Sequence, residues 1–326
     1  MRALICNALA PDLGGVSLGD VDTPRIGPND VLVKNRAACV NFPDLLMTDG
    51  KYQHRPDLPF IIGMESAGDV VEVGSAVSGT AVGDRVIVGG KSGAFAEYRA
   101  APASLVRPIP AGLDYAEAAA HTAGLLTAYV ALVRLGQIRS GETVLIHGAA
   151  GGVGLAAVSL AQHLGARVIA TSASEAKRQW LRDECGLEHV VASGEHLRAE
   201  VKAVASSNGI DLCFDPVGGD VFDQSVRCMA FGGRYLVIGF TSGRIPDISV
   251  NYPLIKGFSI IGVRAGEYGR RFPDKGRENI VTIDALAAAG LKPHNGARFD
   301  LADALNALHH LKSRKAIGRV SITMPR

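Results

Sequence analysis

A glycine-rich turn between a strand and a helix constrains the fold of this chain more than any other feature. The segment TVLIH (143–147) is apolar and rich in β-branched residues, which predicts a buried strand. HGAAGGVG (147–154) overlaps its end, and a helical pattern begins at Gly151. Gly148, Gly151 and Gly154 permit a tight turn and let the backbone of a helix N-terminus approach a pyrophosphate. The spacing is GxxGxxG rather than GxGxxG, so a turn required only for helix–sheet packing is the alternative.

After this turn, apolar runs alternate with helical patterns of about 10–15 residues. Further strands are predicted at 166–172, 189–192, 210–215, 233–239 and 258–263. Strands separated in this way form a parallel sheet with helices on both faces. This part of the chain is therefore predicted to be a doubly wound α/β domain.

The segment before residue 115 has a different sequence pattern. Short runs rich in Val and Ile at 31–40, 66–74 and 84–90 are bounded by Gly, Asp and Pro, which predicts an all-β, barrel-like unit. The C-terminal part returns to helix over 276–289 and 301–312 and ends with a strand at 318–324.

Length and charge limit the classes of protein to which the chain could belong. Its 326 residues fit about two domains. Lys and Arg number 34 and Asp and Glu 32, so the net charge is +2 and no strong field attracts nucleic acid or an anionic membrane. The five cysteines are scattered without a CxxC pair, and the first residues lack the pattern of a secretory signal. We expect a cytoplasmic protein without nucleic-acid or membrane partners.

The end of the second strand of the α/β domain indicates which dinucleotide binds. An Asp or Glu there holds the ribose 2′-hydroxyl of NAD, but this strand ends with TSAS (171–174). Lys177 and Arg178 follow one turn into the next helix, and hydroxyls with a nearby cation suit a 2′-phosphate. NADP is therefore predicted. In the alternative, both cations lie on a solvated helix face and Glu175 pairs with one of them.

Several further motifs follow one another along the chain, namely NFPDLLMTDGKY (41–52), GMESAGDVVEVG (63–74), GDRV (83–86), GLLTAY (124–129), the glycine turn and DPVGG (215–219). In this order they resemble a known family, the zinc-independent quinone oxidoreductases, which are zeta-crystallin-like members of the medium-chain dehydrogenase/reductase superfamily. The resemblance implies a GroES-like β-barrel catalytic domain over 1–120, completed by 266–326. It also implies an inserted Rossmann domain with a doubly wound parallel sheet over 121–265, and NADPH as cofactor.

Zinc-dependent relatives carry a ligand Cys where this chain has Asn41, and the His of a Gly-His-Glu motif where it has Met64. An amide and a thioether are poor zinc ligands, so no metal is predicted. Without a Lewis acid, hydride is expected to go to an acceptor that is already electron-poor, which is a quinone or an activated C=C bond.

The resemblance also implies which residues contact the cofactor. Thr127 approaches the nicotinamide carboxamide, the backbone of Gly151, Gly152 and Val153 meets the phosphates, Ser172 and Lys177 meet the 2′-phosphate, and Gly239, Phe240 and Val263 lie on the nicotinamide side. Asn41, Gly148, Ala150 and Val217 complete the expected set. Ser193 stands where many relatives carry a tyrosine near the 2′-phosphate.

Asn41, Asp44 and Tyr52 are the candidate catalytic residues. Asn41 takes the place of the metal ligand, and Tyr52 could bind a quinone oxygen or supply a proton. Asn41 followed three residues later by Asp44 also resembles a capping box, so a structural role for Asp44 is the alternative. The alternative for Tyr52 is packing against the barrel. His147, at the end of a buried strand, is expected to be structural.

The predicted function is NADPH-dependent reduction of quinones, with a small-molecule electron acceptor as the partner. The enzymatic alternative is reduction of α,β-unsaturated carbonyls such as an enoyl-CoA or a haloacrylate. A crystallin-like or RNA-binding role is the non-enzymatic alternative, and the small net charge argues against RNA. The family resemblance further implies a homodimer formed through the edge strand near 258–263.

Overall fold

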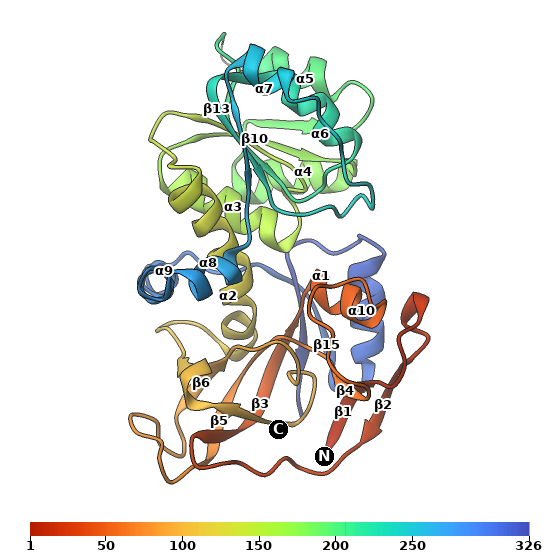
Figure 1. Cartoon of the computed structure of the whole chain (residues 1–326), viewed down its shortest axis with the longest axis vertical. Coiled ribbons are helices and arrows are strands. Elements are labelled where there is room, and N and C mark those ends of the chain that lie inside the picture. Colours follow the sequence, from red (N-terminus) through yellow and green to blue (C-terminus); the bar gives the residue numbers. More distant parts are fainter. Residues whose placement is uncertain (206, 326) are drawn as a thin grey trace. The chain divides into compact units, whose positions relative to one another are not determined.

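The computed structural model describes residues 1–205 and 207–325 (Figure 1). The chain divides into two compact units, one formed by Met1–Thr122 with Ala285–Arg326 and the other by Ala123–Asp284. We call them the outer unit and the inserted unit. Residues 266–284 belong to the inserted unit, whereas the sequence analysis assigned them to the other domain.

The inserted unit contains a six-stranded sheet whose strands all run parallel, in the order β11-β10-β9-β12-β13-β14. The strands are β9 (Thr143–Ile146), β10 (Arg167–Ser172), β11 (His189–Ala192), β12 (Ile210–Asp215), β13 (Met229–Val237) and β14 (Ser259–Gly262). The strand order reverses between β9 and β12. In such sheets ligands bind beyond the carboxyl ends of the strands at this switch point.

Helices lie on both faces of this sheet (Figure 1). The helical elements that lie wholly within the inserted unit are α3 (Gly152–His163), α4 (Glu175–Cys185), α5 (Leu197–Val204), α6 (Asp220–Ser225), the 3₁₀ turn η4 (Val226–Cys228), α7 (Asn251–Lys256) and α8 (Ala265–Arg271). Two further helices contain the boundaries between the units: α2 (Tyr115–Tyr129), which continues as the π-helical turn η3 (Val130–Leu135), and α9 (Pro273–Ala288).

One side of the parallel sheet buries alternate residues of neighbouring strands. Leu145, Ile169, Cys213 and Tyr235 form a single apolar cluster, on which Phe222 of α6 packs. The central strand β9 is buried at all four of its residues, and such a short, continuous apolar run is typical of a strand in a parallel sheet that is covered on both faces. The predicted doubly wound sheet is confirmed.

The outer unit consists mainly of antiparallel strands in two sheets, of orders β15-β16-β3-β5-β6-β8 and β2-β1-β4, with β7 also pairing with β3. The strands are β1 (Arg2–Cys6), β2 (Val16–Asp20), β3 (Asp30–Val40), β4 (Phe60–Ile61), β5 (Glu65–Val73), β6 (Arg85–Val88), β7 (Tyr98–Pro102), β8 (Val106–Pro108), β15 (Asn295–Asp300) and β16 (Arg319–Thr323). Its helical elements are η1 (Pro11–Leu13), α1 (Phe42–Thr48), η2 (Ala103–Leu105), η5 (Leu301–Asp303) and α10 (Ala304–Lys312).

The last strand of the chain completes the outer unit. β16 pairs antiparallel with β3, so that Val320 lies opposite Val40, and pairs parallel with β15. Val320 and Ile322 pack with Leu4 and Leu308 in the largest core cluster of this unit. The predicted GroES-like β domain, completed by the C-terminal segment, is confirmed as a fold.

Within the part of the chain that the structure describes, one helical stretch, Tyr115–Leu135, is long and apolar enough to cross a membrane by length and composition. However, 56% of its most apolar window is buried inside the protein, and the core helix of a globular domain passes the same test. A single such helix is weak evidence for a membrane span. The cytoplasmic location stays a prediction.

Candidate functional site

The glycine turn lies at the switch point of the parallel sheet. Gly148 follows β9 with a φ of 57°, in the left-handed region that favours glycine, and Gly151 donates its N–H to the Gly148 carbonyl over 2.9 Å. Gly151 is also the N-cap of α3, so the first N–H groups of that helix point out of the turn. Gly151, Gly152 and Val153 are partly exposed, whereas Ala150 is buried. Such a helix N-terminus attracts phosphate.

Close packing explains the third glycine of the motif. A Cβ atom on Gly154 would lie 2.2 Å from the Gly148 carbonyl oxygen and 2.8 Å from the Cα atom of Ala149. Only a residue without a side chain lets α3 start directly against the turn. Gly154 therefore serves helix–turn packing, which is the alternative considered for the motif. Gly151 and Gly152 are partly exposed, so their backbone stays accessible to a ligand.

Helix α2 reaches the same turn. A Cβ atom on Gly124 would come within 3.4 Å of the Gly152 carbonyl oxygen and within 3.7 Å of Ala156 on α3. Thr127 follows Gly124 on α2 and is half-buried. The structure thus brings the helix that carries Thr127 to the glycine turn, as its proposed contact with the cofactor requires.

Two further loops leave the carboxyl ends of β12 and β13. Val217 lies in the first loop, and a Cβ atom on Gly148 would contact its Cγ2 atom at 3.4 Å. Gly239 and Phe240 lie in the second loop, which donates hydrogen bonds to the first. Val263 follows β14, is buried, and donates its N–H to the Val237 carbonyl over 2.9 Å. The residues expected at the cofactor in these loops therefore lie at one edge of the sheet.

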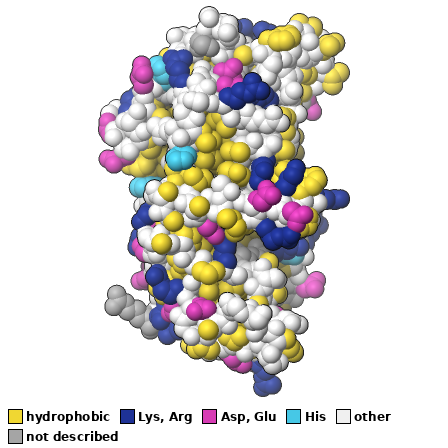
Figure 2. Space-filling model, turned by 90° about the vertical axis from the view of Figure 1, so that its left-hand side faces the viewer, with side chains coloured by type: hydrophobic (Ala, Val, Ile, Leu, Met, Phe, Trp, Pro, Cys, Tyr) yellow, Lys and Arg dark blue, Asp and Glu magenta, His cyan; other side chains and the backbone are white. Residues whose placement is uncertain are grey.

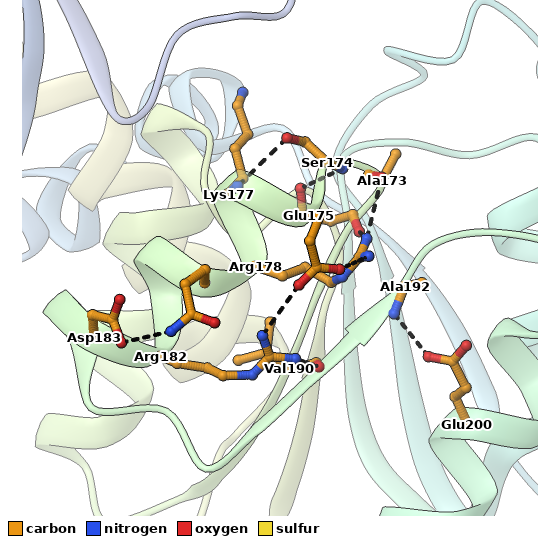
Figure 3. Close-up of polar contacts among 12 residues, drawn as sticks. Ala173, Ser174, Glu175, Lys177, Arg178, Arg182, Asp183, Val190, Ala192 and Glu200 are labelled. Carbon is orange, nitrogen blue, oxygen red and sulfur yellow. Dashed lines mark hydrogen bonds and ion pairs between the residues drawn. The ribbon is translucent and has the colours of Figure 1, made fainter.

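The end of β10 carries the residues expected at a 2′-phosphate (Figure 3). Ser172 is buried, and its Oγ atom accepts the N–H of Ser174 over 3.4 Å. Ser174 caps α4, and its Oγ atom accepts the N–H of Lys177 over 3.4 Å. Partial burial lowers the pKa of the Lys177 ammonium. Ser172, Ser174 and Lys177 thus bring two hydroxyls and a cation to the end of β10, the second strand of the α/β domain in chain order.

Arg178 supports this segment instead of facing solvent. Its Nη1 atom donates to the carbonyl oxygens of Ser172 at 2.8 Å and Ala173 at 3.1 Å, and its Nη2 atom pairs with Glu175 (Figure 3). Arg182 also lies near the Glu175 carboxylate, at 3.6 Å. The predicted alternative, in which Glu175 pairs with one of the two cations, is correct for Arg178.

His147 has a structural position. It is fully buried, with Nδ1 2.9 Å from Thr171 Oγ1 and Nε2 2.8 Å from Ser225 Oγ. Ser225 donates its hydroxyl hydrogen to the Val221 carbonyl, so Nε2 of His147 is the donor in the His–Ser contact. Burial lowers the pKa of His147 to about 4, which keeps the ring neutral at pH 7.

A second polar cluster lies in the outer unit, around Asn41 at the end of β3. Asn41 Nδ2 donates to the Cys39 carbonyl at 3.2 Å and to Glu65 Oε2 at 3.1 Å, while its Oδ1 atom accepts from Arg319 Nη2 at 2.8 Å. Arg319 Nη2 also pairs with Glu65 Oε2 at 3.2 Å. Both amide hydrogens of Asn41 are thus committed within the protein, and its side chain can offer a substrate only an acceptor lone pair.

Asp44 caps α1 from within the same cluster. Its Oδ2 atom accepts the N–H of Asn41 over 2.7 Å, which is the acidic half of a capping box. Among the described residues, its Oδ1 atom has no hydrogen-bond partner. Burial, together with the nearby Glu65 carboxylate, raises the pKa of Asp44 to about 7. The structural role is therefore present, and the carboxyl group also titrates in the neutral range.

The sequence analysis missed Glu65, Arg319 and Arg99, three buried charges near Asn41. The Arg99 guanidinium donates to Ser66 Oγ and to the carbonyls of Val88, Gly89, Ser92 and Met64, and so ties the start of β5 to the 89–92 loop. Burial lowers the pKa of Arg99 to about 10, so it remains charged at pH 7. Arg99 is the single charge in YRAAP (98–102) and Arg319 the single charge in RVSIT (319–323), which was the available signal in the sequence, whereas Glu65 shares its strand with Asp69 and Glu72.

Tyr52 is half-buried and packs against the core cluster of the outer unit. Packing against the barrel is the alternative to a catalytic role that the sequence offered for Tyr52. Its catalytic role stays a prediction. The structure brings Asn41 and Asp44 together in the outer unit and the other cofactor residues together in the inserted unit.

Comparison with known proteins identifies the family. The model of the alcohol dehydrogenase GroES-like domain matches residues 27–111, and the model of the zinc-binding dehydrogenase matches 152–279. A quinone oxidoreductase-like protein 2 homolog from Nematostella vectensis is 36% identical over 98% of this chain and 88% of its own. The chain belongs to the quinone oxidoreductase family of the medium-chain dehydrogenase/reductase superfamily. This family member is therefore an oxidoreductase.

Solved structures agree with this assignment to the quinone oxidoreductase family. A probable oxidoreductase from Mycobacterium abscessus is 36% identical, with a TM-score of 0.90 over 99% of this chain and 98% of that one. The Escherichia coli quinone oxidoreductase complexed with NADPH is 27% identical, with a TM-score of 0.90 over 99% of this chain and 100% of that one.

The name of one matching family model mentions zinc, but the side chains of this quinone oxidoreductase family member do not fit a zinc site. The guanidinium of Arg319 already binds Asn41 and Glu65, and it places a fixed positive charge where a zinc ion would need donors. Within residues 1–205 and 207–325, no group of three or more His, Cys, Asp or Glu side chains is arranged to hold a metal ion.

Proposed function

We propose that the protein reduces quinones with NADPH. The observation that carries this proposal is the accessible glycine turn at the switch point, followed along the sheet edge by the Ser172–Lys177 segment with hydroxyls and a cation. The first feature suits a pyrophosphate and the second suits a 2′-phosphate. The complex of the E. coli quinone oxidoreductase with NADPH supports the same cofactor.

The residues that would hold NADPH follow from their positions. The backbone of Gly148, Ala150, Gly151, Gly152 and Val153 would meet the pyrophosphate, and Ser172 with Lys177 would meet the 2′-phosphate. Thr127, Val217, Gly239, Phe240 and Val263 would surround the nicotinamide side. Asn41, which lies in the outer unit, is the remaining residue that the family resemblance implies for the cofactor. When bound, NADPH supplies the hydride.

The chemistry left to the protein is positioning and proton supply. Reduction of a quinone to a hydroquinone requires one hydride and one proton, and the proton comes from a donor or from solvent. A tyrosine phenol can donate such a hydrogen bond or proton, which is the role proposed for Tyr52. Asn41 and Asp44 would form the polar side of the quinone site next to Tyr52. Arg319 and Glu65 hold the Asn41 amide in one orientation. Most of the rate would come from positioning and polarisation.

Reduction of an α,β-unsaturated carbonyl is the second candidate. The mycoketide-CoA synthase of Mycobacterium tuberculosis (strain ATCC 25618 / H37Rv) is 36% identical over 94% of this chain, which corresponds to 7% of that much longer protein. Ene reduction would use the same hydride source and would add the hydride to the β-carbon and a proton to the α-carbon. An enoyl-CoA or a haloacrylate would be a substrate of this kind.

An RNA-binding role has no support from the distribution of charge. On the face drawn in Figure 2, basic and acidic side chains are interspersed. The cations Arg270 and Arg271 both pair with Glu267, and Arg277 pairs with Asp274. An extended basic track is the feature that single-stranded RNA requires.

The proposed homodimer would form through β14, the edge strand of the parallel sheet. Four large apolar side chains nearby are more than 70% exposed, namely Phe231, Val250, Leu254 and Ile255. Helix α7 lies at the top of Figure 1, and hydrophobic side chains gather at the same height in Figure 2. An open strand edge beside such side chains favours pairing with a second copy. Light scattering at micromolar concentration tests this, and particles of about 34 kDa alone would refute it.

The deciding experiment follows NADPH oxidation optically with ortho-quinones and with a short enoyl-CoA in parallel, and with NADH as the control cofactor. Quinone turnover with a preference for NADPH is expected. Turnover of the enoyl-CoA alone would replace the proposed acceptor and keep the cofactor. Binding titrations that detect neither NADPH nor NADH would overturn the cofactor assignment itself.

A further inference from the structure

A buried carboxylate joins the loops at the switch point. Asp215 ends β12 and is 1% exposed. Its Oδ1 atom accepts the N–H groups of Val217 at 2.8 Å and Gly218 at 2.9 Å. Its Oδ2 atom accepts the hydroxyl of Tyr235 over 2.7 Å. Three hydrogen bonds thus fix one side chain and, through it, the first turn of the loop after β12.

The main chain of the same residue organises the next loop. The Asp215 carbonyl accepts the N–H groups of Ile238 at 2.9 Å and Gly239 at 3.4 Å. The loop after β13 also donates from Thr241 to the Pro216 carbonyl and from Ser242 to the Val217 carbonyl, both over 3.0 Å. The loops after β12 and β13 are therefore joined by hydrogen bonds, and Asp215 accepts hydrogen bonds from both of them.

This pair of loops faces the glycine turn. Pro216 and Val217 lie against Gly148, and a Cβ atom there would meet them at 3.6 and 3.4 Å. The ring of Phe240 packs over Gly218, where an added Cβ atom would lie 2.9 Å from Cδ1 of the ring. The position of the paired loops thus sets the width of the space beside the turn after β9.

Tyr235 lies inside the sheet, on the strand next to the one that ends with Asp215. It is fully buried on β13, and its ring packs edge-on against Phe222 with centroids 4.9 Å apart. These ring contacts hold the hydroxyl at a fixed place, because a buried aromatic ring has few alternative rotamers. Without that hydroxyl, Oδ2 of the buried Asp215 carboxylate loses the hydrogen bond that fixes it, and the carboxylate gains by turning toward solvent.

We propose that Tyr235 is a positioning residue for the cofactor. Through Asp215 it holds the loops after β12 and β13 at the distance from the glycine turn that NADPH requires, although its own side chain is too deeply buried to touch a ligand. The inference rests on the proposed function, because it assumes that the space beside the turn binds NADPH.

The test compares Tyr235→Phe with Tyr115→Phe. Both substitutions remove a tyrosine hydroxyl that donates to a carboxylate, since Tyr115 donates to Asp69 Oδ1 over 2.5 Å in the outer unit. NADPH affinity is measured by the fluorescence of the bound nucleotide, well below the melting temperature of each variant, and KM for the quinone is measured separately. Asp215→Asn is the conservative variant, because its amide oxygen still accepts both N–H groups and its NH₂ group can donate to Tyr235.

Tyr235→Phe is expected to raise the Kd for NADPH about tenfold, which corresponds to the loss of one hydrogen bond to a charged group. KM for the quinone stays within about twofold, Tyr115→Phe leaves the Kd within about twofold, and Asp215→Asn gives a Kd closer to that of the unaltered protein. Equal Kd values for the Tyr235→Phe variant and the unaltered protein would overturn the inference, and so would equal effects of the two Tyr→Phe substitutions. Failure of the unaltered protein to bind NADPH would instead overturn the proposed function and this inference with it.

Discussion

Arg319 Nη2 lies 3.2 Å from Glu65 Oε2, and both side chains are less than a tenth exposed. The two residues lie on strands β16 and β5, which are separated by β3 in the sheet of the outer unit. Asn41 connects to both of them, donating to the carboxylate and accepting from the guanidinium. A buried ion pair thus fixes the Asn41 amide from both of its ends.

Arg319→Ala is expected to lower the free energy of unfolding by about 3–5 kcal/mol, because it leaves the Glu65 carboxylate buried without its cation. Urea denaturation measures the effect. Arg271→Ala, which breaks an exposed pair with Glu267, is the control and should leave the free energy of unfolding nearly unchanged. Adding Glu65→Gln to Arg319→Ala should recover part of the loss. A cost for Arg319→Ala no larger than that of the control would contradict a structural role for the pair.

Asp44 makes stability depend on pH in a direction opposite to that of most carboxylates. Because its pKa is raised from 3.8 to about 7 in the folded state, the folded protein keeps a proton that the unfolded chain has already lost between these values. Its contribution to stability is therefore complete below about pH 4 and falls as the pH rises toward about 7. Relative to the Asp44→Asn variant, the unaltered protein should lose about 2 kcal/mol between pH 5 and pH 8.

The measurement for Asp44 is a series of denaturant titrations of both proteins at pH 5, 6, 7 and 8. The difference between their free energies of unfolding isolates this carboxyl group from the other titrating groups. A difference that stays constant over the series would show that Asp44 is ionised throughout, as a carboxylate with a normal pKa would be.

Glu175 and Arg178 are expected to tune the choice between NADPH and NADH. Arg178→Ala removes the cation that neutralises Glu175 and supports the Ser172 and Ala173 carbonyls, so the Kd for NADPH should rise about tenfold and the Kd for NADH much less. Glu175→Gln should leave or improve NADPH binding, and the double variant should recover part of the loss. Calorimetric titration with both nucleotides checks these values.

Arg227→Ala, which removes an exposed cation from the same unit, is the matched control for the loss of one positive charge. It should change neither Kd. Equal weakening of NADPH and NADH binding by Arg178→Ala would mean that Arg178 only supports the backbone and does not discriminate between the nucleotides.

Gly154→Ala should prevent the start of α3 from packing against the glycine turn. The added Cβ atom would lie 2.2 Å from a carbonyl oxygen, so backbone must shift, at a cost of at least about 1–3 kcal/mol. Nucleotide binding should be lost with the geometry of the turn. At Gly194, by contrast, an added Cβ meets no described atom within 4 Å, and Gly194→Ala should leave melting temperature and NADPH affinity unchanged. Normal NADPH binding by the Gly154→Ala variant would contradict the assigned role of the turn.

The sequence predicted those features that depend on neighbours along the chain. The glycine turn, the six parallel strands and the contact of Asp44 with Asn41 all arise from local spacing, so periodicity and capping rules could find them. The strand β15 (NGARFD) was not predicted, because only Ala297 and Phe299 alternate inward and its pairing with the distant β16 determines its conformation.

The parts of the site that escaped prediction depend on contacts across the chain. Glu65 and Arg319 are 254 residues apart, and each is the first residue of its strand. Tyr235 looked like an ordinary core residue, since nothing in GRYLVIG indicates that its hydroxyl meets Asp215. Residues of this kind are recognised only when the sheet brings distant strands together.

The pairing of β16 with β3 has a consequence for biosynthesis. The inserted unit is one continuous segment, Ala123–Asp284, and its strands can pair as soon as that segment leaves the ribosome. The outer unit lacks β16 until residues 319–323 have been synthesised, which is after the whole inserted unit, so β3 and the Asn41 cluster stay open until then. Nascent chains stalled shortly before residue 319 should therefore contain a protease-resistant inserted unit beside a protease-sensitive outer unit.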